Sequence, residues 1–204
     1  MEAVDRRRGI TLRQGSLRYI VVHRLSLASF DEEANPDPIP DHLLTGAELV
    51  QRFRNRALGT GGATPYHALV CLDNGAHVEQ LLRLSVRGAH AGDVRQGPEH
   101  VGYNWRSLAV AVVGNADERH ITGSQYTSLV RVCSQWLPMR AGGLFVEGHT
   151  FLPGASKDPN KRCPGRFLDM DTVRRSVDSM MPAGWQIWNE DTGQSWTAQH
   201  GWEI

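Results

Sequence analysis

Residues 107–113 read SLAVAVV, and this stretch decides the fold. Every position after the serine is apolar, and valine, a β-branched residue that favours strands, recurs along it. A strand with one face in water alternates apolar and polar residues, whereas a strand covered on both faces is apolar throughout. The stretch therefore predicts a central strand of a covered sheet.

Two flanking segments predict further strands, each ending on a histidine. Leu17–His23 (LRYIVVH) and Leu144–His149 (LFVEGH) are short apolar runs. Between them, Tyr66–Leu72 and His77–Leu82 flank Asp73-Asn74-Gly75, and Asn-Gly supplies the positive φ angles of a tight turn. We expect an antiparallel hairpin there.

Three segments predict helices, and each begins at a residue whose side chain can cap backbone N–H groups. They run from a capping box at Thr45 and Glu48 to about Leu58, from a capping box at Thr122 and Gln125 to about Pro138, and onward from Asp169. Apolar residues recur at steps of three and four in the last two. The proline-containing stretch from Leu25 to Pro40 predicts a surface loop.

Strands and helices alternate over residues 17–182, which predicts a single α/β domain with a central mixed β-sheet flanked by helices. Residues 1–16 form an N-terminal extension in this interpretation. Residues 183–204 hold four of the six tryptophans, namely Trp185, Trp188, Trp196 and Trp202. A segment this short does not fold alone. We expect a tail that packs its rings on the domain, and a sugar-stacking accessory role is the alternative.

Composition excludes several classes of protein. The chain has 204 residues, of which 40% are hydrophobic and 22% charged, as in a soluble globular protein. Lys plus Arg and Asp plus Glu each total 22, so no net positive charge is available to bind nucleic acid. No stretch approaches the ~20 apolar residues of a membrane span, and no apolar run or cleavage site follows Arg6, Arg7 and Arg8. We expect a monomer made in the cytoplasm without a signal peptide.

The three cysteines differ in their surroundings. They lack CxxC spacing and cannot all pair within the chain, which favours a reducing compartment at synthesis. Cys71 and Cys133 lie in apolar patterns typical of buried residues. Cys163 lies in a polar loop beside Lys161 and Arg162, where positive charge would favour the thiolate. All the other cations except Lys157 are arginines.

His23, His149 and Cys163 together could hold a metal. The ends of sheet strands open onto the usual ligand crevice of α/β proteins, so side chains far apart in sequence can converge there. Two imidazoles and a thiolate suit Zn²⁺, and three protein ligands leave a fourth position for water, as in catalytic sites. Spacing alone does not separate this hypothesis from structural histidines that form ordinary hydrogen bonds.

Six segments occur in an order that resembles a known family. They are YIVVH, PYHALVCLDNGAHVEQ, GAHAG, YNWRSLAVAVVGN, EGH and KRCPG. The series resembles the zinc-dependent N-acetylmuramoyl-L-alanine amidases of the phage lysozyme and peptidoglycan recognition protein superfamily. The resemblance covers about residues 17–177 and implies the amidase/peptidoglycan-recognition-like fold.

The resemblance also implies roles for individual residues. It places the zinc ligands at His23, His149 and Cys163. It makes Tyr66, which precedes the histidine of the hairpin's first strand, and Lys161, two residues before the cysteine, catalytic residues.

Four further residues are given roles outside the ligand set and the catalytic pair, and two features depart from the family. His90, in GAHAG, is expected to form a wall of the substrate groove, and Trp105, in YNWRS, to bind substrate. His67 and His77 are interpreted as structural residues of the hairpin. Many relatives have two adjacent histidines after the first strand, whereas this chain has His23-Arg24. The long segment TFLPGASKDPNKR between the last two ligands is a further departure.

The implied activity is cleavage of the amide between the muramoyl lactyl group and L-alanine. Zinc would activate water and polarise the carbonyl, Tyr66 would hydrogen-bond the attacking water, and Lys161 would stabilise the oxyanion. Tyr66 could instead be a packed strand aromatic, and Lys161 a solvated loop charge. We expect loss of Lys161 to reduce turnover far more than binding.

Three functions remain open. The first is a phage-type lytic enzyme, or endolysin, that acts on the cell wall after release or delivery. The second is a cytoplasmic muropeptide-recycling amidase or a delivered cell-wall toxin. The third is a binding module that recognises muropeptide without cutting it, although loss of the cysteine ligand marks such members of the family and Cys163 is present.

Overall fold

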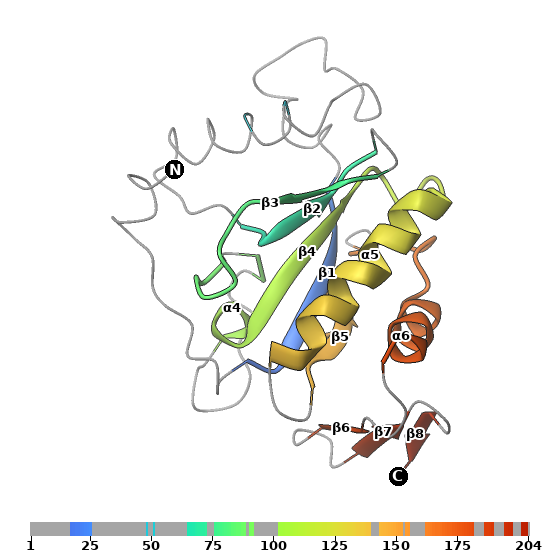
Figure 1. Cartoon of the computed structure of the whole chain (residues 1–204). Coiled ribbons are helices and arrows are strands. Elements are labelled where there is room, and N and C mark those ends of the chain that lie inside the picture. The colour runs from blue at the N-terminus through green and yellow to red at the C-terminus, as the bar shows by residue number, and fades with distance from the viewer. Residues whose placement is uncertain are drawn as a thin grey trace.

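The computed structural model in Figure 1 describes most of the α/β domain and three strands near the C-terminus. The described residues are 17–25, 48, 51, 65–72, 76–88, 90–91, 102–139, 143–152, 154–155, 162–181, 186–189, 194–197 and 201–203. The predicted helix from Thr45 to Leu58 lies outside these residues except for Glu48 and Gln51, which are both helical.

The domain is built on a five-stranded mixed sheet with the order β3-β2-β4-β1-β5. Its strands are β1 (Tyr19–Leu25), β2 (Ala68–Val70), β3 (Val78–Gln80), β4 (Ser107–Val113) and β5 (Phe145–Gly148). β2, β4, β1 and β5 pair in parallel, and β3 pairs antiparallel with β2. The predicted fold class is confirmed.

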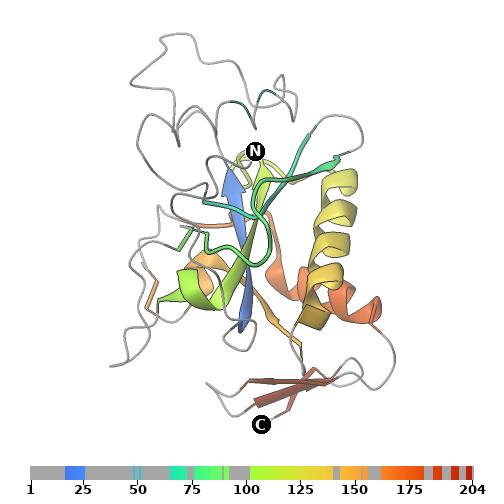
Figure 2. The ribbon, with the colours of Figure 1, turned by 60° about the vertical axis from the view of Figure 1, so that its left-hand side comes forward.

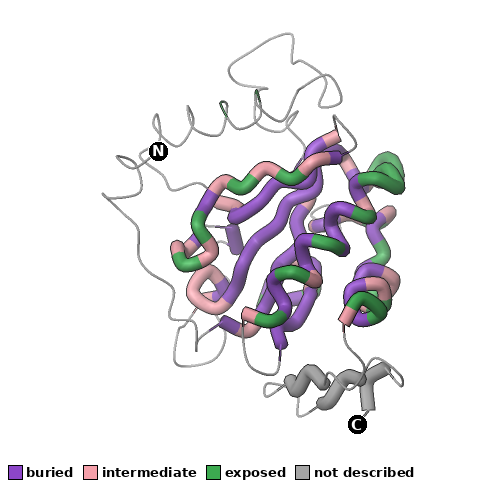
Figure 3. The backbone as a smooth tube through the Cα atoms, in the orientation of Figure 1, coloured by how far each residue is buried: buried purple, intermediate pink, exposed green. Residues whose placement is uncertain are grey.

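β4 occupies the centre of the sheet, as its sequence predicts. All seven residues of β4 are buried, and the strand is drawn in the buried colour along its length in Figure 3. Its bounds, Ser107–Val113, are those predicted. A strand hydrogen-bonded on both sides and covered on both faces needs apolar side chains throughout, so SLAVAVV specifies this position.

Helices α5 (Gly123–Trp136) and α6 (Met170–Ser179) lie on the same side of the sheet (Figures 1 and 2). The predicted capping box opens α5, because Thr122 and Gln125 exchange side-chain and backbone hydrogen bonds. Asp169 caps α6 as predicted by accepting from the N–H of Asp171. Both helices contribute apolar residues to the main core, Leu129 and Val173 among them.

The two faces of the sheet differ in what covers them. A Cβ built on Gly148 would lie 3.2 Å from Met170 of α6, so Gly148 and its register partner Val22 face the helices. Successive strand residues point to opposite faces. His23 therefore lies on the face opposite the helices, together with its register partner Ala111.

The strand boundaries near the two histidines differ from those predicted. β1 continues to Leu25, because its parallel pairing with β4 extends two residues beyond His23. β5 ends at Gly148, and His149 begins a 3-10 turn, η4 (His149–Phe151).

The hairpin and a short helix complete the comparison with the sequence. The antiparallel hairpin is confirmed, with paired strands shorter than the apolar runs, and its turn at Asp73-Asn74-Gly75 lies outside the described residues. A short helix, α4 (Tyr103–Arg106), precedes β4. A 3-10 turn, η3 (Leu137–Met139), follows α5. The predicted loop after Leu25 also lies outside the described residues.

The C-terminal segment contains strands that its sequence did not predict. β6 (Gln186–Asn189), β7 (Gln194–Thr197) and β8 (Gly201–Glu203) form an antiparallel sheet in that order. Packing of the tail's tryptophans on the domain stays a prediction.

Among the described residues, no helix combines the length and apolar character needed to cross a membrane.

Gln125 offers a test of how α5 is attached to the sheet. Its amide nitrogen donates to the carbonyl of Val113 at 2.8 Å, and its amide oxygen accepts from the N–H of Thr122 at 3.1 Å. Gln125→Leu leaves two backbone groups without these partners and should lower the free energy of unfolding by about 1–3 kcal/mol. Urea denaturation measures this change. Gln135→Leu, at an exposed position of the same helix, should change it by less than about 0.5 kcal/mol, and equal effects would contradict this account.

Candidate metal site

The structure gathers His23, His149 and Cys163 into one cluster. Their ligand atoms all lie within 4.8 Å of one another. Parallel pairing of β1 with β5 places Val22 opposite Gly148, so the residues that follow them, His23 and His149, are brought side by side. Their ring centroids are 4.6 Å apart. Cys163 arrives from the loop before α6, with its Sγ 3.5 Å from Nδ1 of His23.

The donor set and its spacing fit a zinc ion. Zn–S bonds of about 2.3 Å and Zn–N bonds of about 2.0–2.1 Å at a tetrahedral angle separate sulfur and nitrogen by about 3.5 Å. The distance between Cys163 Sγ and His23 Nδ1 has this value. Two imidazoles and one sulfur leave one tetrahedral position for another ligand.

Burial keeps both histidines of the cluster neutral. His23 is 2% exposed, and burial together with the nearby His90 and His149 holds its pKa well below the usual value. Burial also lowers the pKa of His149, against a hydrogen bond with the Ala91 backbone that raises it. Neutral imidazole is the form that binds a metal.

His90 lies behind His23 instead of forming a groove wall. It is 7% exposed, and its Nδ1 lies 3.0 Å from Nε2 of His23. Its Nε2 lies 3.0 Å from Oγ of Ser107, the first residue of β4. This placement differs from the expected role of His90 in substrate contact, because both ring nitrogens are directed at protein groups.

Asn104 of α4 fixes the backbone around His90. Its side-chain oxygen accepts hydrogen bonds from the N–H groups of His90 and Ala91, at 3.0 and 2.8 Å. Neither Asn104 nor Ser107 is predicted as a site residue from the sequence. Both lie in the YNWRS segment, so the order of the family segments was the available signal.

Arg24 directly follows His23 in β1. Its guanidinium donates to the side chain of Asn115 at 2.6 Å and forms an ion pair with Asp117. Asp117 also receives the backbone N–H of Arg166 at 3.0 Å. Arg24 thereby connects β1, the loop after β4 and the loop that carries Cys163.

Two further contacts fix the loop that carries Cys163. The backbone N–H and the hydroxyl of Thr150 both donate to the carbonyl of Cys163 at 2.9 Å, which joins the second and third residues of the cluster. Gly165 has a φ of +117°, and a Cβ there would lie 2.6 Å from the backbone of Ala116. Only glycine allows so close an approach.

Among the described residues, Arg24 supplies the positive charge that acts on Cys163. Burial raises the pKa of the Cys163 thiol to about 11, and the opposing positive charge comes from Arg24. Lys161 lies outside the described residues, and the described Arg162 is exposed. Without a metal the residue is therefore a thiol at neutral pH, because burial outweighs the nearby charge. Cys71 and Cys133 are buried in the core, as predicted.

Tyr66 and Trp105 lie at two different places. The Tyr66 ring centroid is 5.2 Å from that of His23, while the residue also packs against the apolar cluster of Leu69 and Val113. Trp105 lies half-buried on α4, with the Arg87 guanidinium carbon 4.6 Å from its ring centroid. These contacts put Tyr66 beside the cluster.

The two remaining hairpin histidines have the structural contacts expected of them. Nδ1 of His67 accepts from the N–H of Ala109 at 2.9 Å, and its Nε2 lies 2.8 Å from the carbonyl of Val86. His77 is half-buried and lies 3.0 Å from the Glu79 carboxylate.

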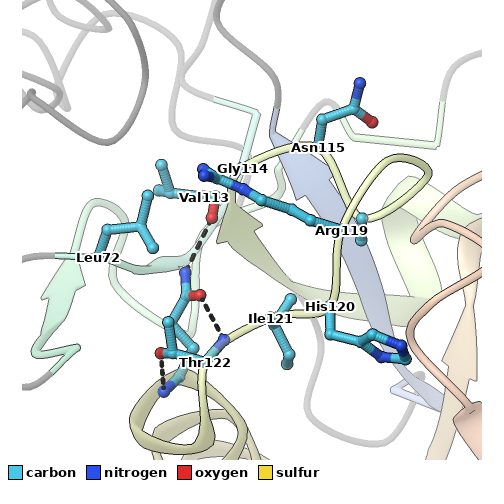
Figure 4. A pocket seen from close by; sticks show the side chains of 10 residues that line it. Leu72, Val113, Gly114, Asn115, Arg119, His120, Ile121 and Thr122 are labelled. Atoms are coloured by element: carbon cyan, nitrogen blue, oxygen red, sulfur yellow. Dashed lines mark hydrogen bonds between the residues drawn. The ribbon is translucent and has the colours of Figure 1, made fainter.

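A small pocket of about 80 Å³ lies beside the end of β4 (Figure 4). Leu72, Ile121 and the aliphatic part of Arg119 line it, near the hydrogen bonds of Gln125 drawn in the figure. His23, His149 and Cys163 are not among its lining residues, so it is separate from the candidate metal site.

A mixed sheet with helices on one face and a His-His-Cys cluster at the strand ends defines an α/β protein with a candidate catalytic metal site. Residues 13–166 match the family described as N-acetylmuramoyl-L-alanine amidase. The chain belongs to this family, which confirms the resemblance inferred from its six segments. No match was found among curated proteins.

Solved structures share the fold at low sequence identity. The endolysin N-acetylmuramoyl-L-alanine amidase LysCS from Clostridium intestinale URNW is 19% identical, with a TM-score of 0.55 over 82% of this chain and 88% of that chain. The Ph2119 endolysin, from a Thermus scotoductus MAT2119 bacteriophage, is 18% identical, with a TM-score of 0.53 over 87% and 92%. A chain from the complex of peptidoglycan recognition proteins LCa and LCx bound to tracheal cytotoxin is 17% identical, with a TM-score of 0.55 over 82% of this chain and 86% of that chain.

The pKa of Cys163 gives a prediction for the metal-free protein. The thiolate is the reactive form, so its fraction rises about tenfold per pH unit below the pKa. With a pKa of about 11, alkylation of Cys163 by iodoacetamide should keep accelerating from pH 7 to about pH 10. Mass spectrometry of the modified peptide measures the rate, with Cys163→Ser as the control. A rate that levels off below pH 9 would contradict the burial that raises this pKa.

Proposed function

We propose that the protein is a zinc-dependent N-acetylmuramoyl-L-alanine amidase that cleaves the bond between the muramoyl lactyl group and L-alanine of peptidoglycan. The observation that carries the proposal is the convergence of His23, His149 and Cys163, with the nitrogen–sulfur spacing of a zinc site. Membership of the amidase family supports it.

The three residues would hold the ion and leave one position open. When bound, zinc would lower the pKa of a water molecule towards 7 and polarise a carbonyl oxygen. The imidazoles of His23 and His149 are already neutral because they are buried. Hydrogen bonds hold two members of the cluster, because Thr150 donates to the carbonyl of Cys163 and His149 is hydrogen-bonded to the backbone of Ala91.

Tyr66 is proposed to hydrogen-bond the attacking water or to shuttle its proton. The distance of 5.2 Å between the ring centroids of Tyr66 and His23 supports this role. Lys161 is proposed from the sequence alone as the cation that stabilises the oxyanion. The ring nitrogens of His90 are directed at His23 and Ser107, and its contact with substrate stays a prediction from the sequence. Trp105 stays a proposed substrate contact.

The family and its structural neighbours support peptidoglycan as the proposed substrate class. Structural neighbours bind tracheal cytotoxin, a muropeptide ligand, which supports recognition of peptidoglycan fragments. The chain has no net charge, so contacts to the cell wall must come from a shaped site instead of a cationic surface.

The biological setting is a separate proposal. The similarity to two endolysin structures favours a lytic enzyme that reaches the cell wall after release or delivery. A cytoplasmic recycling amidase would prefer soluble muropeptides to polymeric sacculi, so comparing the two substrates separates these settings. A non-catalytic binding module is disfavoured because Cys163 lies within the cluster.

The central test combines zinc content with product analysis. Purified protein incubated with peptidoglycan should release free L-alanine N-termini, detected by amine labelling and mass spectrometry. It should contain about one zinc per chain. His149→Ala should remove the activity, and it should weaken zinc binding because one of three ligands is lost.

His77→Ala is the matched control for this test, since His77 is a half-buried histidine paired with Glu79 on the hairpin. It should keep both zinc and activity. Intact muropeptides after incubation of the zinc-loaded protein would refute the proposed reaction. Zinc-free protein that binds muropeptide, with binding unchanged in Cys163→Ser, would favour the binding module.

Lys161 gives a kinetic prediction. Removing one donor to an oxyanion costs about 10²–10³-fold in kcat, because the interaction forms in the transition state. Lys161→Ala should therefore lower kcat by about that factor and leave KM nearly unchanged, as measured on a soluble muropeptide. Lys157→Ala, at the other lysine of the chain, is the control and should behave like the unmodified protein. A rise in KM with kcat unchanged would assign Lys161 to binding.

A further inference from the structure

We propose that His90 is a positioning residue which, with Ser107, fixes the proton of His23 on Nε2 and leaves Nδ1 of His23 free to bind a metal. The inference rests on the proposed metal site for its consequence, and the hydrogen bonds that carry it lie entirely within the protein. They form a chain from the backbone of Tyr103 through Ser107 and His90 to His23.

The direction of the chain is set at Ser107. Its Oγ lies 2.5 Å from the carbonyl oxygen of Tyr103, which can only accept a hydrogen bond. At this distance the single hydroxyl proton of Ser107 must point at that carbonyl. Oγ of Ser107 therefore has only lone pairs to offer its second partner.

That second partner is His90. Its Nε2 lies 3.0 Å from Oγ of Ser107, so this nitrogen must carry a proton and donate it. A neutral imidazole carries one proton, and its other nitrogen is an acceptor. Nδ1 of His90 is therefore the acceptor, and it lies 3.0 Å from Nε2 of His23.

His23 completes the chain. Because Nδ1 of His90 accepts, Nε2 of His23 must carry the proton and donate it. Nδ1 of His23 then has a bare lone pair, and this is the nitrogen 3.5 Å from Sγ of Cys163. Hydrogen-bond direction alone thus selects the tautomer that presents a ligand atom to the cluster.

The position of His90 is fixed from several sides. Asn104 accepts from its backbone N–H, and a Cβ on Gly88 would lie 3.3 Å from the His90 ring and 2.5 Å from the carbonyl of Pro65. The ring planes of His23 and His90 are inclined at 83° with centroids 5.1 Å apart. With both ring nitrogens hydrogen-bonded and the side chain 7% exposed, the His90 ring is held in one orientation.

Ser107 is needed because a histidine is an ambiguous partner. A carboxylate or a carbonyl behind a metal-binding histidine can only accept, and so sets the tautomer by itself. His90 could either donate to His23 or accept from it. The hydroxyl of Ser107, committed to the Tyr103 carbonyl, removes this ambiguity.

The first experiment reads the tautomers directly. Long-range ¹H–¹⁵N correlation spectra of the full-length, zinc-free chain, labelled with ¹⁵N-histidine and held near pH 8, distinguish a proton on Nδ1 from one on Nε2. We expect His23 and His90 both to carry it on Nε2. His67 serves as an internal control, since Ala109 donates to its Nδ1 and its tautomer is fixed independently.

Two variants test the consequence for metal binding. Ser107→Ala should convert His23 to a mixture of tautomers and weaken zinc binding, because His90 loses its directional partner. Loss of a hydrogen-bonding partner behind a metal ligand costs about 10–100-fold in affinity, and His90→Leu should reach the upper part of this range. Zinc affinity is measured by competition with a chromophoric chelator. Ser128→Ala, at a buried serine of α5, is the matched control and should leave affinity and tautomers unchanged.

The possible results separate this inference from the proposed function. A proton on Nδ1 of His23 in the unmodified chain would overturn the inference even if the enzyme is active. So would unchanged tautomers and zinc affinity in Ser107→Ala. Absence of amide cleavage, with the expected tautomers and the loss in affinity, would refute the proposed function and leave the inference standing. If His90→Leu does not fold, the Ser107→Ala result decides.

Discussion

Parallel pairing of β1 with β4 on one side and with β5 on the other is the constraint on which the rest of the structure depends. The register that sets Val22 opposite Gly148 also sets His23 beside His149, although the two histidines are 126 positions apart in the sequence. A shift of one residue would turn His23 towards the helices, because side chains alternate between the faces of a strand. The pairing of β1 with β4 runs over all seven residues of both strands, so it holds β1 in the position from which it pairs with β5.

A network of hydrogen bonds surrounds the cluster of His23, His149 and Cys163 and orients its side chains. Its parts come from the segment around His90, from Asn104 and Ser107 next to β4, and from the Arg24–Asp117 ion pair. A buried polar group without a partner costs free energy, so a polar layer of this kind is stable only when its members satisfy one another. The same hydrogen bonds that lower this cost also restrict each imidazole to one orientation.

Sequence reasoning found the fold and the members of the cluster, and physical reasons explain what it missed. SLAVAVV and the two capping boxes are local patterns, so β4, α5 and the start of α6 were predictable from neighbouring residues alone. The end of β1 depends on pairing with β4, which no local pattern encodes. His90 looked like a groove residue because its partners, His23 and Ser107, are 67 and 17 positions away. The sequence marks Arg24 only as a departure from relatives. Its ion pair depends on the position of Asp117, which is distant in the sequence.

The protonation of the three candidate ligands sets how the site would respond to pH. Burial lowers the pKa values of His23 and His149, so both are neutral near pH 7 and release no proton when a metal ion binds. Burial raises the pKa of Cys163 to about 11, so this residue must release a proton when a metal ion binds its sulfur. One proton exchanged for one ion makes the apparent affinity increase about tenfold per pH unit below that pKa. The burial that keeps the imidazoles neutral therefore raises the free energy needed to deprotonate the Cys163 thiol. Arg24 lowers the pKa of Cys163 and so reduces this free energy. Arg24 lowers this pKa first through a backbone hydrogen bond and then through its charge, while Asp117, its ion-pair partner, raises it, so a neutral side chain at position 24 would remove only the second contribution.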